Sequence, residues 1–122
     1  MAKKTRYSDK ELEMFDKLLV EKLEKANEEL QYYLNQIQEL AEREETKIKG
    51  LDDGNGTPES ERLQSLAARQ RKLIQHLDNA RIRIKNKVYG ICRESGTLIS
   101  KARLKAVPHA TLSIQAKQKR TR

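Results

Sequence analysis

The sequence predicts a mainly α-helical fold: a long antiparallel coiled-coil hairpin over residues 1–88, then a small module and a C-terminal helix over residues 89–122. Charged residues make up 36% of the 122 residues and aromatic residues only 4%, which favours solvated helices over a thick core. Five glycines and two prolines are too few for the turns of an all-β fold. Apolar residues also recur at steps of three and four along two long stretches, as they do in helices that pack through a seam.

The first expected helix runs from Ser8 to Lys49 and opens with the capping-box pattern of Ser8 and Glu11. Its apolar residues follow a narrow heptad seam, which Asp16 and Glu44 interrupt. The seam consists of Leu12, Leu19, Leu23, Ala26, Leu30, Tyr33, Ile37 and Leu40. A narrow seam is typical of a coiled coil rather than of a helix in a globular core.

Three glycines, an asparagine and a proline lie between Gly50 and Pro58, so we expect the hairpin tip at about residues 50–58. Thr57 suits the cap and Pro58 the first position of a second helix, which we expect to reach about Val88. One short connection between two seamed helices implies an antiparallel hairpin. The second seam consists of Leu63, Leu66, Gln70, Leu73, Leu77, Ala80 and Ile84. Further apolar residues, expected to pack on a terminal segment or a partner, are Phe15, Leu18, Ile74 and Ile82.

The positive charge is concentrated in the last third of the chain. Residues 81–122 carry 12 basic side chains and one acidic side chain, which favours an anionic partner: nucleic acid or an acidic protein surface. No stretch is long and apolar enough to span a membrane. A single cysteine, Cys92, forms no internal disulfide, so we expect a cytoplasmic protein.

The most specific pattern begins with Tyr89-Gly90-Ile91-Cys92 and continues through Arg103-Leu104-Lys105-Ala106-Val107-Pro108 to Ala110. This framework resembles the finger of the DksA/TraR family. That family binds bacterial RNA polymerase and carries a four-cysteine zinc finger after a coiled-coil hairpin. The resemblance therefore implies a zinc-finger-like module over residues 89–122.

The zinc ligands of the family have the spacing C-x2-C-x17-C-x2-C, and those positions hold Cys92, Ser95, Ser113 and Ala116 here. Three of the four ligands are missing, and structural zinc needs four thiolate or imidazole ligands. We therefore expect no zinc and no other cofactor, and interpret Cys92 as a small buried apolar side chain. Apolar packing would replace the metal, through Val88, Ile91, Leu98, Ile99, Leu104, Val107, Leu112 and Ile114.

In the family, acidic residues at the hairpin tip follow a D-x-x-D-x-A pattern and approach the catalytic centre of the polymerase. Asp52 and Asp53 keep the acidic character here, but no frame fits the pattern. Two interpretations stay open: the pair acts electrostatically inside the polymerase, or it forms an ordinary Asp-Gly turn.

The resemblance implies a monomeric transcription regulator that inserts its hairpin into the secondary channel of RNA polymerase without sequence-specific DNA contact. The alarmone ppGpp is a candidate ligand on the same grounds. Basic contacts to the polymerase rim are expected at Arg81, Arg83, Lys85, Arg93, Arg103 and Lys105.

Two other functions stay open: a helical-hairpin protein-interaction module, and a non-specific nucleic-acid binder that uses the basic last third. The sequence shows neither a nucleophile with a positioned base nor a glycine-rich phosphate loop, so we expect no enzymatic activity. His76 is expected on a solvated helix face, and His109 beside a turn.

Overall fold

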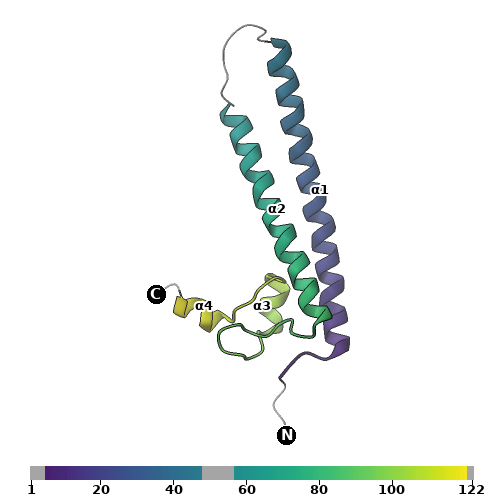
Figure 1. Cartoon of the computed structure of the whole chain (residues 1–122), viewed down its shortest axis with the longest axis vertical. Coiled ribbons are helices and arrows are strands. Elements are labelled where there is room, and N and C mark those ends of the chain that lie inside the picture. Colours follow the sequence, from purple (N-terminus) through teal and green to yellow (C-terminus); the bar gives the residue numbers. More distant parts are fainter. Residues whose placement is uncertain (1–4, 48–56, 121–122) are drawn as a thin grey trace. The chain divides into compact units, whose positions relative to one another are not determined.

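The computed structural model describes residues 5–47 and 57–120, without the side chains of residues 45–47 and 120. Four helices account for most of this part of the chain: α1 (Asp9–Lys47), α2 (Pro58–Lys85), α3 (Lys101–Ala106) and α4 (Ile114–Arg120) (Figure 1). The predicted mainly α-helical fold is therefore confirmed. Within the described ranges, none of the helices has the length and apolar character that a membrane span requires.

Helix α1 begins at the predicted capping box. The backbone N–H of Ser8 donates to Glu11 Oε1 at 3.0 Å, and the backbone N–H of Glu11 donates to Ser8 Oγ at 3.2 Å. These two bonds satisfy amides that have no partner within the helix. The helix is described as far as Lys47, so its expected extension to Lys49 lies outside the described residues.

Helix α2 begins as predicted, with Pro58 in its first position and the backbone N–H of Ser60 donating to Thr57 Oγ1 at 3.1 Å. It ends at Lys85 rather than at the expected Val88. Lys87 adopts a left-handed φ of 62°, while the N–H groups of Lys87 and Val88 donate to Ile84 O and Arg83 O. These two hydrogen bonds close the turn that ends the helix. The sequence did not indicate this helix end, because glycine rather than lysine usually takes the left-handed position.

The contacts divide the chain into two compact units, which are described separately: Glu24–Ile74, and Met1–Leu23 with Gln75–Arg122. In the first of them, the second half of α1 and the first half of α2 run antiparallel (Figure 1). Ala26, Leu63 and Ala67 are buried there, two of them at predicted seam positions. Most other apolar seam residues of this unit are half-buried, as expected for two helices with a narrow contact. The expected division at residue 88 stays a prediction.

The second unit, which we call the finger unit, joins the beginning of α1 and the end of α2 to the C-terminal module. Its core is aromatic at the centre: the Phe15 ring lies 5.6 Å from that of Tyr7 and 5.4 Å from that of Tyr89, between ring centroids. Aromatic pairs at these separations contribute about 0.5–1.5 kcal/mol beyond their buried area. The expectation that Phe15 packs on a terminal segment is thus confirmed, since Tyr7 precedes α1. Ile82, by contrast, is 54% exposed.

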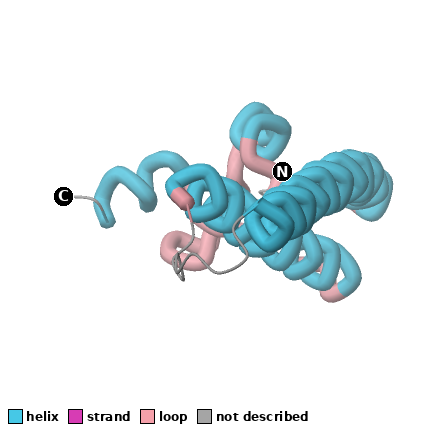
Figure 2. Tube along the Cα trace, turned by 90° about the horizontal axis from the view of Figure 1, so that it is seen from above, coloured by secondary structure: helices cyan, strands magenta, loops and turns pink. Residues whose placement is uncertain are grey.

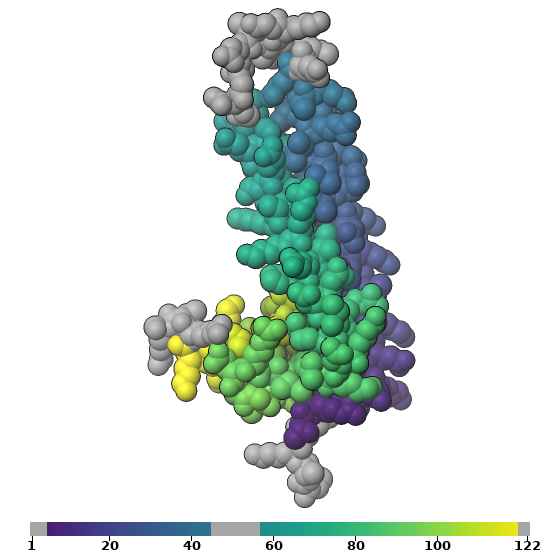
Figure 3. Space-filling view, in the orientation of Figure 1, coloured from purple at the N-terminus to yellow at the C-terminus, as the bar shows by residue number. Residues whose placement is uncertain are grey.

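Tyr7 also packs the N-terminal segment against the module. Its hydroxyl donates to the backbone carbonyl of Ile99, and its ring lies on Gly90, where a Cβ atom would stand 2.6 Å from the ring. Gly90 has a left-handed φ of 78°, so glycine is required there both by conformation and by contact. Figure 3 shows this segment, in purple, against the green part of the module.

The module consists of a loop, α3, a turn at Pro108 and α4, with loops joining the helices (Figure 2). Ile99 and Leu104 are fully buried, as predicted, but Val88 is 46% and Ile114 48% exposed. These two assignments to the core were wrong, because the finger core centres on Tyr89 instead. The C-terminal helix expected within residues 89–122 is α4, which begins at Ile114, and α3 was not predicted.

Candidate functional site

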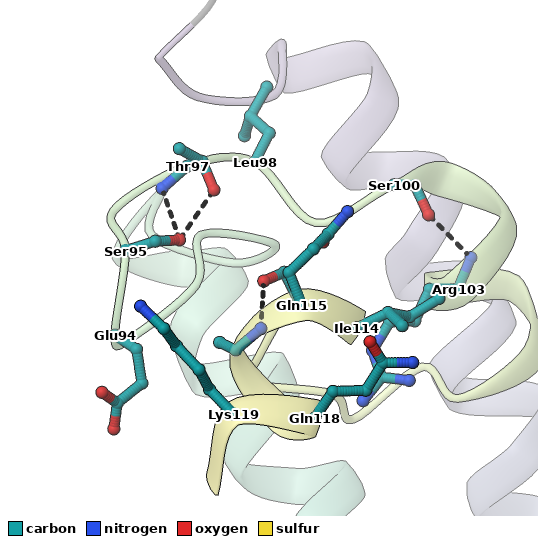
Figure 4. A pocket seen from close by; sticks show the side chains of 12 residues that line it. Glu94, Ser95, Thr97, Leu98, Ser100, Arg103, Ile114, Gln115, Gln118 and Lys119 are labelled. Carbon is teal, nitrogen blue, oxygen red and sulfur yellow. Dashed lines mark hydrogen bonds between the residues drawn. The ribbon is translucent and has the colours of Figure 1, made fainter.

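The module begins with a tight loop that carries the first two family ligand positions. The Cys92 N–H donates to Thr97 O at 2.8 Å, and the Gly96 N–H donates to Cys92 O at 2.9 Å. Ser95 is exposed, and its hydroxyl lies 2.7 Å from that of Thr97 (Figure 4). The loop thus buries the thiol of Cys92 and gives the hydroxyl of Ser95 a partner within the loop.

The other two ligand positions lie at the start of α4. The Ser113 N–H donates to Cys92 Sγ at 3.3 Å, and Ser113 Oγ accepts from the Ala116 N–H at 3.2 Å. All three residues are buried. Ser113 therefore connects the loop to the helix: its amide bonds the sulfur, and its hydroxyl caps α4.

The residues at these four positions do not fit a zinc ion. A structural zinc site needs four thiolate or imidazole ligands, and only Cys92 supplies one. The hydroxyl of Ser113 already accepts a helix amide, and Ala116 has no donor atom. Within residues 5–47 and 57–120, no three His, Cys, Asp or Glu side chains are grouped so that they could hold a metal ion.

The sulfur of Cys92 is a hydrogen-bond acceptor rather than a purely apolar group. Burial raises the pKa of its thiol, but hydrogen bonds from Ser95 and Ser113 outweigh this and lower the pKa to about 6. The expectation that Cys92 is buried is confirmed, with 1% of the residue exposed. Its interpretation as a small apolar side chain needs correction, because polar donors surround the sulfur.

Side-chain hydrogen bonds hold the rest of the module together. The Tyr89 hydroxyl donates to Pro108 O at 2.7 Å, and Arg103 Nε donates to Leu112 O at 2.8 Å. Ser100 Oγ accepts from the Arg103 N–H at 3.2 Å and so caps α3 (Figure 4). The bonds from Tyr89 and Arg103 Nε satisfy carbonyl groups of the irregular segment between α3 and α4, which no helix or strand pairs.

A hollow of about 420 Å³ lies between the last turns of α2 and the module; we call it the basic concavity. Four cationic side chains reach it from four segments: Arg83 from α2, Arg93 from the loop, Arg103 from α3 and Lys117 from α4. Its described lining includes no carboxylate. A hollow with several cations and no anion is suited to binding an anion.

The charges in the basic concavity repel one another. Burial, and then the nearby Arg93, lower the pKa of the Arg83 guanidinium. One hydrogen bond offsets this cost in part, because Arg83 Nη2 donates to His109 O at 3.3 Å. An anion bound there would relieve the repulsion.

Two histidines complete the wall of the basic concavity. The rings of His76 and His109 are stacked, with centroids 5.5 Å apart and planes 6° from parallel. Burial lowers the pKa of His109, and His76 and Arg83 lower it further. The His109 Nδ1 atom is buried and has no hydrogen-bond partner in the part of the chain that the structure describes.

The structure brings together three of the six predicted basic residues, Arg83, Arg93 and Arg103. Arg81 lies elsewhere and forms an ion pair with Asp16, at 2.8 Å between Nε and Oδ1. Lys85 and Lys105 are exposed and lie outside the basic concavity. The predicted tip residues, Asp52 and Asp53, lie outside the described residues.

Sequence reasoning missed the participation of His76, His109 and Lys117 in this site. His76 is exposed on α2, as expected, but it also stacks on a residue 33 positions later. No periodicity links these positions, because the irregular turn at Pro108 brings His109 to the helix. The one available signal was the excess of basic residues after residue 80.

The finger unit therefore defines a class: a small finger of the zinc type, with one thiol left, built on the base of a helical hairpin. Residues 87–122 match the family model described as the prokaryotic dksA/traR C4-type zinc finger. A solved structure, that of transcription factor DksA2 from Pseudomonas aeruginosa, matches with a TM-score of 0.73 and 25% sequence identity. The match covers 90% of this chain and 82% of that one.

Two curated proteins from Caulobacter vibrioides, of strains NA1000 / CB15N and ATCC 19089 / CIP 103742 / CB 15, are 46% identical to this chain over 54 residues. Both are named RNA polymerase-binding transcription factor DksA. The matched segment is 44% of this chain, and the chain spans only 38% of the length of these relatives. The comparisons confirm the resemblance to the DksA/TraR family.

Proposed function

We propose that this chain is a non-enzymatic transcription regulator that binds bacterial RNA polymerase. The observation that carries the proposal is the agreement between two matches: the finger model over residues 87–122, and the DksA2 fold over 90% of the chain. The curated relatives are named for binding RNA polymerase, and this property is extended here to the present chain. We place the regulator in the cytoplasm, where the polymerase acts.

The proposed manner of binding is insertion of the hairpin, as a monomer, into the secondary channel of the polymerase. Sequence-specific contact with DNA forms no part of this mechanism. The antiparallel helices of the unit Glu24–Ile74 support the proposal, since α1 and α2 form a narrow pair with a short connection. Asp52 and Asp53 in that connection are the proposed tip residues, which would act on the active site electrostatically.

The proposed contacts with the polymerase rim use basic side chains of the finger unit. Of the six basic residues proposed for them, Lys85, Arg93 and Lys105 are exposed and suited to contact an acidic surface. Arg81, Arg83 and Arg103 also bond within the unit, to Asp16, His109 O and Leu112 O respectively. We therefore expect the exposed three to contribute most to the rate of association.

The basic concavity supports a second part of the proposal, that ppGpp or a similar phosphorylated nucleotide binds this chain. Its volume of about 420 Å³ lies in the range of small-molecule sites, and its cations suit phosphate groups. Calorimetric titration of the purified chain with ppGpp tests this part alone, without polymerase.

The polymerase proposal is tested by a pull-down against purified bacterial RNA polymerase, with and without a competitor that blocks the secondary channel. We expect retention of the chain and its loss when the competitor is added. Retention that the competitor does not change would contradict channel insertion. A mobility-shift assay with duplex and single-stranded DNA, without polymerase, distinguishes the nucleic-acid binder, and sedimentation distinguishes a dimer that hides the hairpin.

The tip residues are tested by the double substitution Asp52→Asn/Asp53→Asn. Removing both charges leaves the finger contacts intact, so we expect binding to the polymerase to persist while transcription output in a reconstituted reaction changes. The matched control is Glu59→Gln/Glu61→Gln, which removes two charges from the first turn of α2. Equal output from the Asn variant and the unaltered protein would show that the acidic pair forms only a turn.

A further inference from the structure

His109, which is stacked on His76, has a protonation equilibrium that no part of the proposed function uses. The two rings lie 5.5 Å apart between centroids, and both line the basic concavity. His109 is half-buried, and its Nδ1 atom has no hydrogen-bond partner among the described residues. The buried Nδ1 atom therefore has no acceptor among the described residues that would stabilise a proton on it.

The charged side chains that line the basic concavity all have the same sign, within the part of the chain that the structure describes. Arg83 reaches the basic concavity from α2, Arg93 from the loop, Arg103 from α3 and Lys117 from α4. Asp78, which lies two residues from His76 on α2, is exposed and is not part of the lining. Without an anion, a proton on His109 would therefore add charge to a cluster that is already positive, and the low pKa of His109 agrees with that.

We propose that the basic concavity binds its anion together with a proton, which His109, stacked on His76, takes up. A bound phosphate group would place negative charge beside the His109 ring and favour its charged form. Linkage then requires the converse: protonation of His109 favours binding of the anion. The chain would thus hold a phosphorylated ligand more tightly as the pH falls through the range in which histidine titrates.

This inference rests on the proposed binding of a phosphorylated ligand, and it concerns how that same site is regulated. His109 is the residue to observe, because its low pKa arises from burial and from its cationic neighbours. Neutralising these neighbours with an anion should raise the pKa of His109. The anion should therefore bind more tightly on the acidic side of the His109 titration than on the basic side.

The direct test is an NMR titration of the His109 imidazole in the whole chain, with and without saturating inorganic pyrophosphate. The variants His76→Gln and His109→Gln assign the two imidazole signals. We expect the midpoint for His109 to move to higher pH when pyrophosphate is bound. The midpoint itself is measured on the unaltered protein, and the variants serve only to assign the signals.

A calorimetric experiment gives the affinities at about pH 6 and about pH 8, on either side of the usual range for histidine. Pyrophosphate itself titrates in this range, so each pH ratio is compared with that of the double variant His76→Gln/His109→Gln. We expect the unaltered protein to gain up to about tenfold more affinity than the double variant on acidification. Arg93→Gln is the control that should weaken binding at both pH values and keep the pH ratio.

Two results would overturn the inference, and they have different meanings. If pyrophosphate binds while the His109 midpoint stays unchanged, the proton linkage fails and the anion site stands. If neither pyrophosphate nor ppGpp binds at either pH, the proposed binding of a phosphorylated ligand is wrong, and the proton linkage is wrong with it. The polymerase proposal is judged separately, by the pull-down.

Discussion

The sulfur of Cys92 stands in a polar environment that comes from the zinc-finger pattern, although the residues around it no longer suit the metal. In the chain, Ser113 N–H donates to this sulfur at 3.3 Å, and Ser95 bonds it as well. Hydrogen-bond donors that point at this sulfur are useful without a metal, because they stabilise a negative charge on that atom. The single thiol thus has a structural role without a metal, with Ser95, Ser113 and Ala116 at the other three positions.

The first prediction concerns the pH dependence of this thiol. Its pKa in the folded chain, about 6, is below the ordinary value of 9.0. The resulting stabilisation is therefore complete above about pH 9, and it is lost as the pH falls through about 6. We expect the free energy of unfolding of the unaltered protein to rise between these pH values relative to Cys92→Ser, which does not titrate.

Urea denaturation of both proteins at several pH values measures this difference. Both are compared in the presence of a reducing agent, which keeps the single thiol free. Parallel curves for the two proteins would show that the thiol has its ordinary pKa in the folded chain.

The second prediction concerns the hydroxyl of Tyr89, which is fully buried and donates to Pro108 O. Tyr89→Phe removes this bond and leaves a buried carbonyl without its donor, so we expect a loss of about 1–3 kcal/mol in the free energy of unfolding. Tyr32→Phe is the matched control, because Tyr32 is 56% exposed and should change stability by less than about 0.5 kcal/mol. Equal effects of the two substitutions would refute the role of the buried bond.

At the residue level, the sequence predicted burial better than bonding. Burial of Cys92, Ile99 and Leu104 could be predicted because the finger framework places these residues inside the module. The bond between Cys92 and Ser113 could not be predicted from periodicity, because 21 residues separate the partners. The wrong core positions, Val88 and Ile114, lie at the edges of regular segments, where an apolar side chain alone does not decide which way the residue faces.

The two long helices, α1 and α2, are the elements that the sequence specifies most directly, since each begins at a cap that can be read locally. Ser8 and Thr57 both accept an amide of the first turn, as their patterns predicted. The ends were less predictable, because α2 stops at a left-handed lysine where glycine is usual. The two short helices, α3 and α4, depend on the finger around them, and helices of this length are not stable alone.

The third prediction belongs to the seam of the helical pair. Gln70 occupies a predicted seam position, and its Oε1 atom is buried without a hydrogen-bond partner within the described residues. Gln70→Leu removes this unsatisfied atom, so we expect the free energy of unfolding to rise by about 1–2 kcal/mol. Thermal or urea denaturation measures this change. The control Gln64→Leu, at an exposed position, should have little effect.

A stability loss from Gln70→Leu would mean that the amide makes a favourable interaction there. A gain accompanied by self-association would instead assign the glutamine a second role. Buried polar residues at seam positions can specify the partner and the register of a coiled coil at a cost in stability. Sedimentation of the variant separates these outcomes.

At the scale of the whole molecule, the chain consists of two compact units, and the proposed function assigns a part to each. The finger unit includes the start of α1 and the end of α2, so the base of the hairpin and the module share one core. Tyr7, Phe15 and Tyr89 form the centre of that core. The sequence predicted the hairpin and the module as successive parts, but the joint core depends on contacts between residues more than 70 positions apart.

The central claim about the molecule is that this core, together with the bonds of Cys92 and Ser113, holds a DksA/TraR-type finger without its metal. A structural zinc ion contributes about 10–16 kcal/mol to the folding of a zinc-finger peptide, so a finger that needed zinc would not fold without it. The claim is therefore tested most directly by the zinc content of the purified, folded, full-length chain, measured by elemental mass spectrometry. We predict far less than one zinc ion per chain; a content close to one ion per folded chain would contradict the claim.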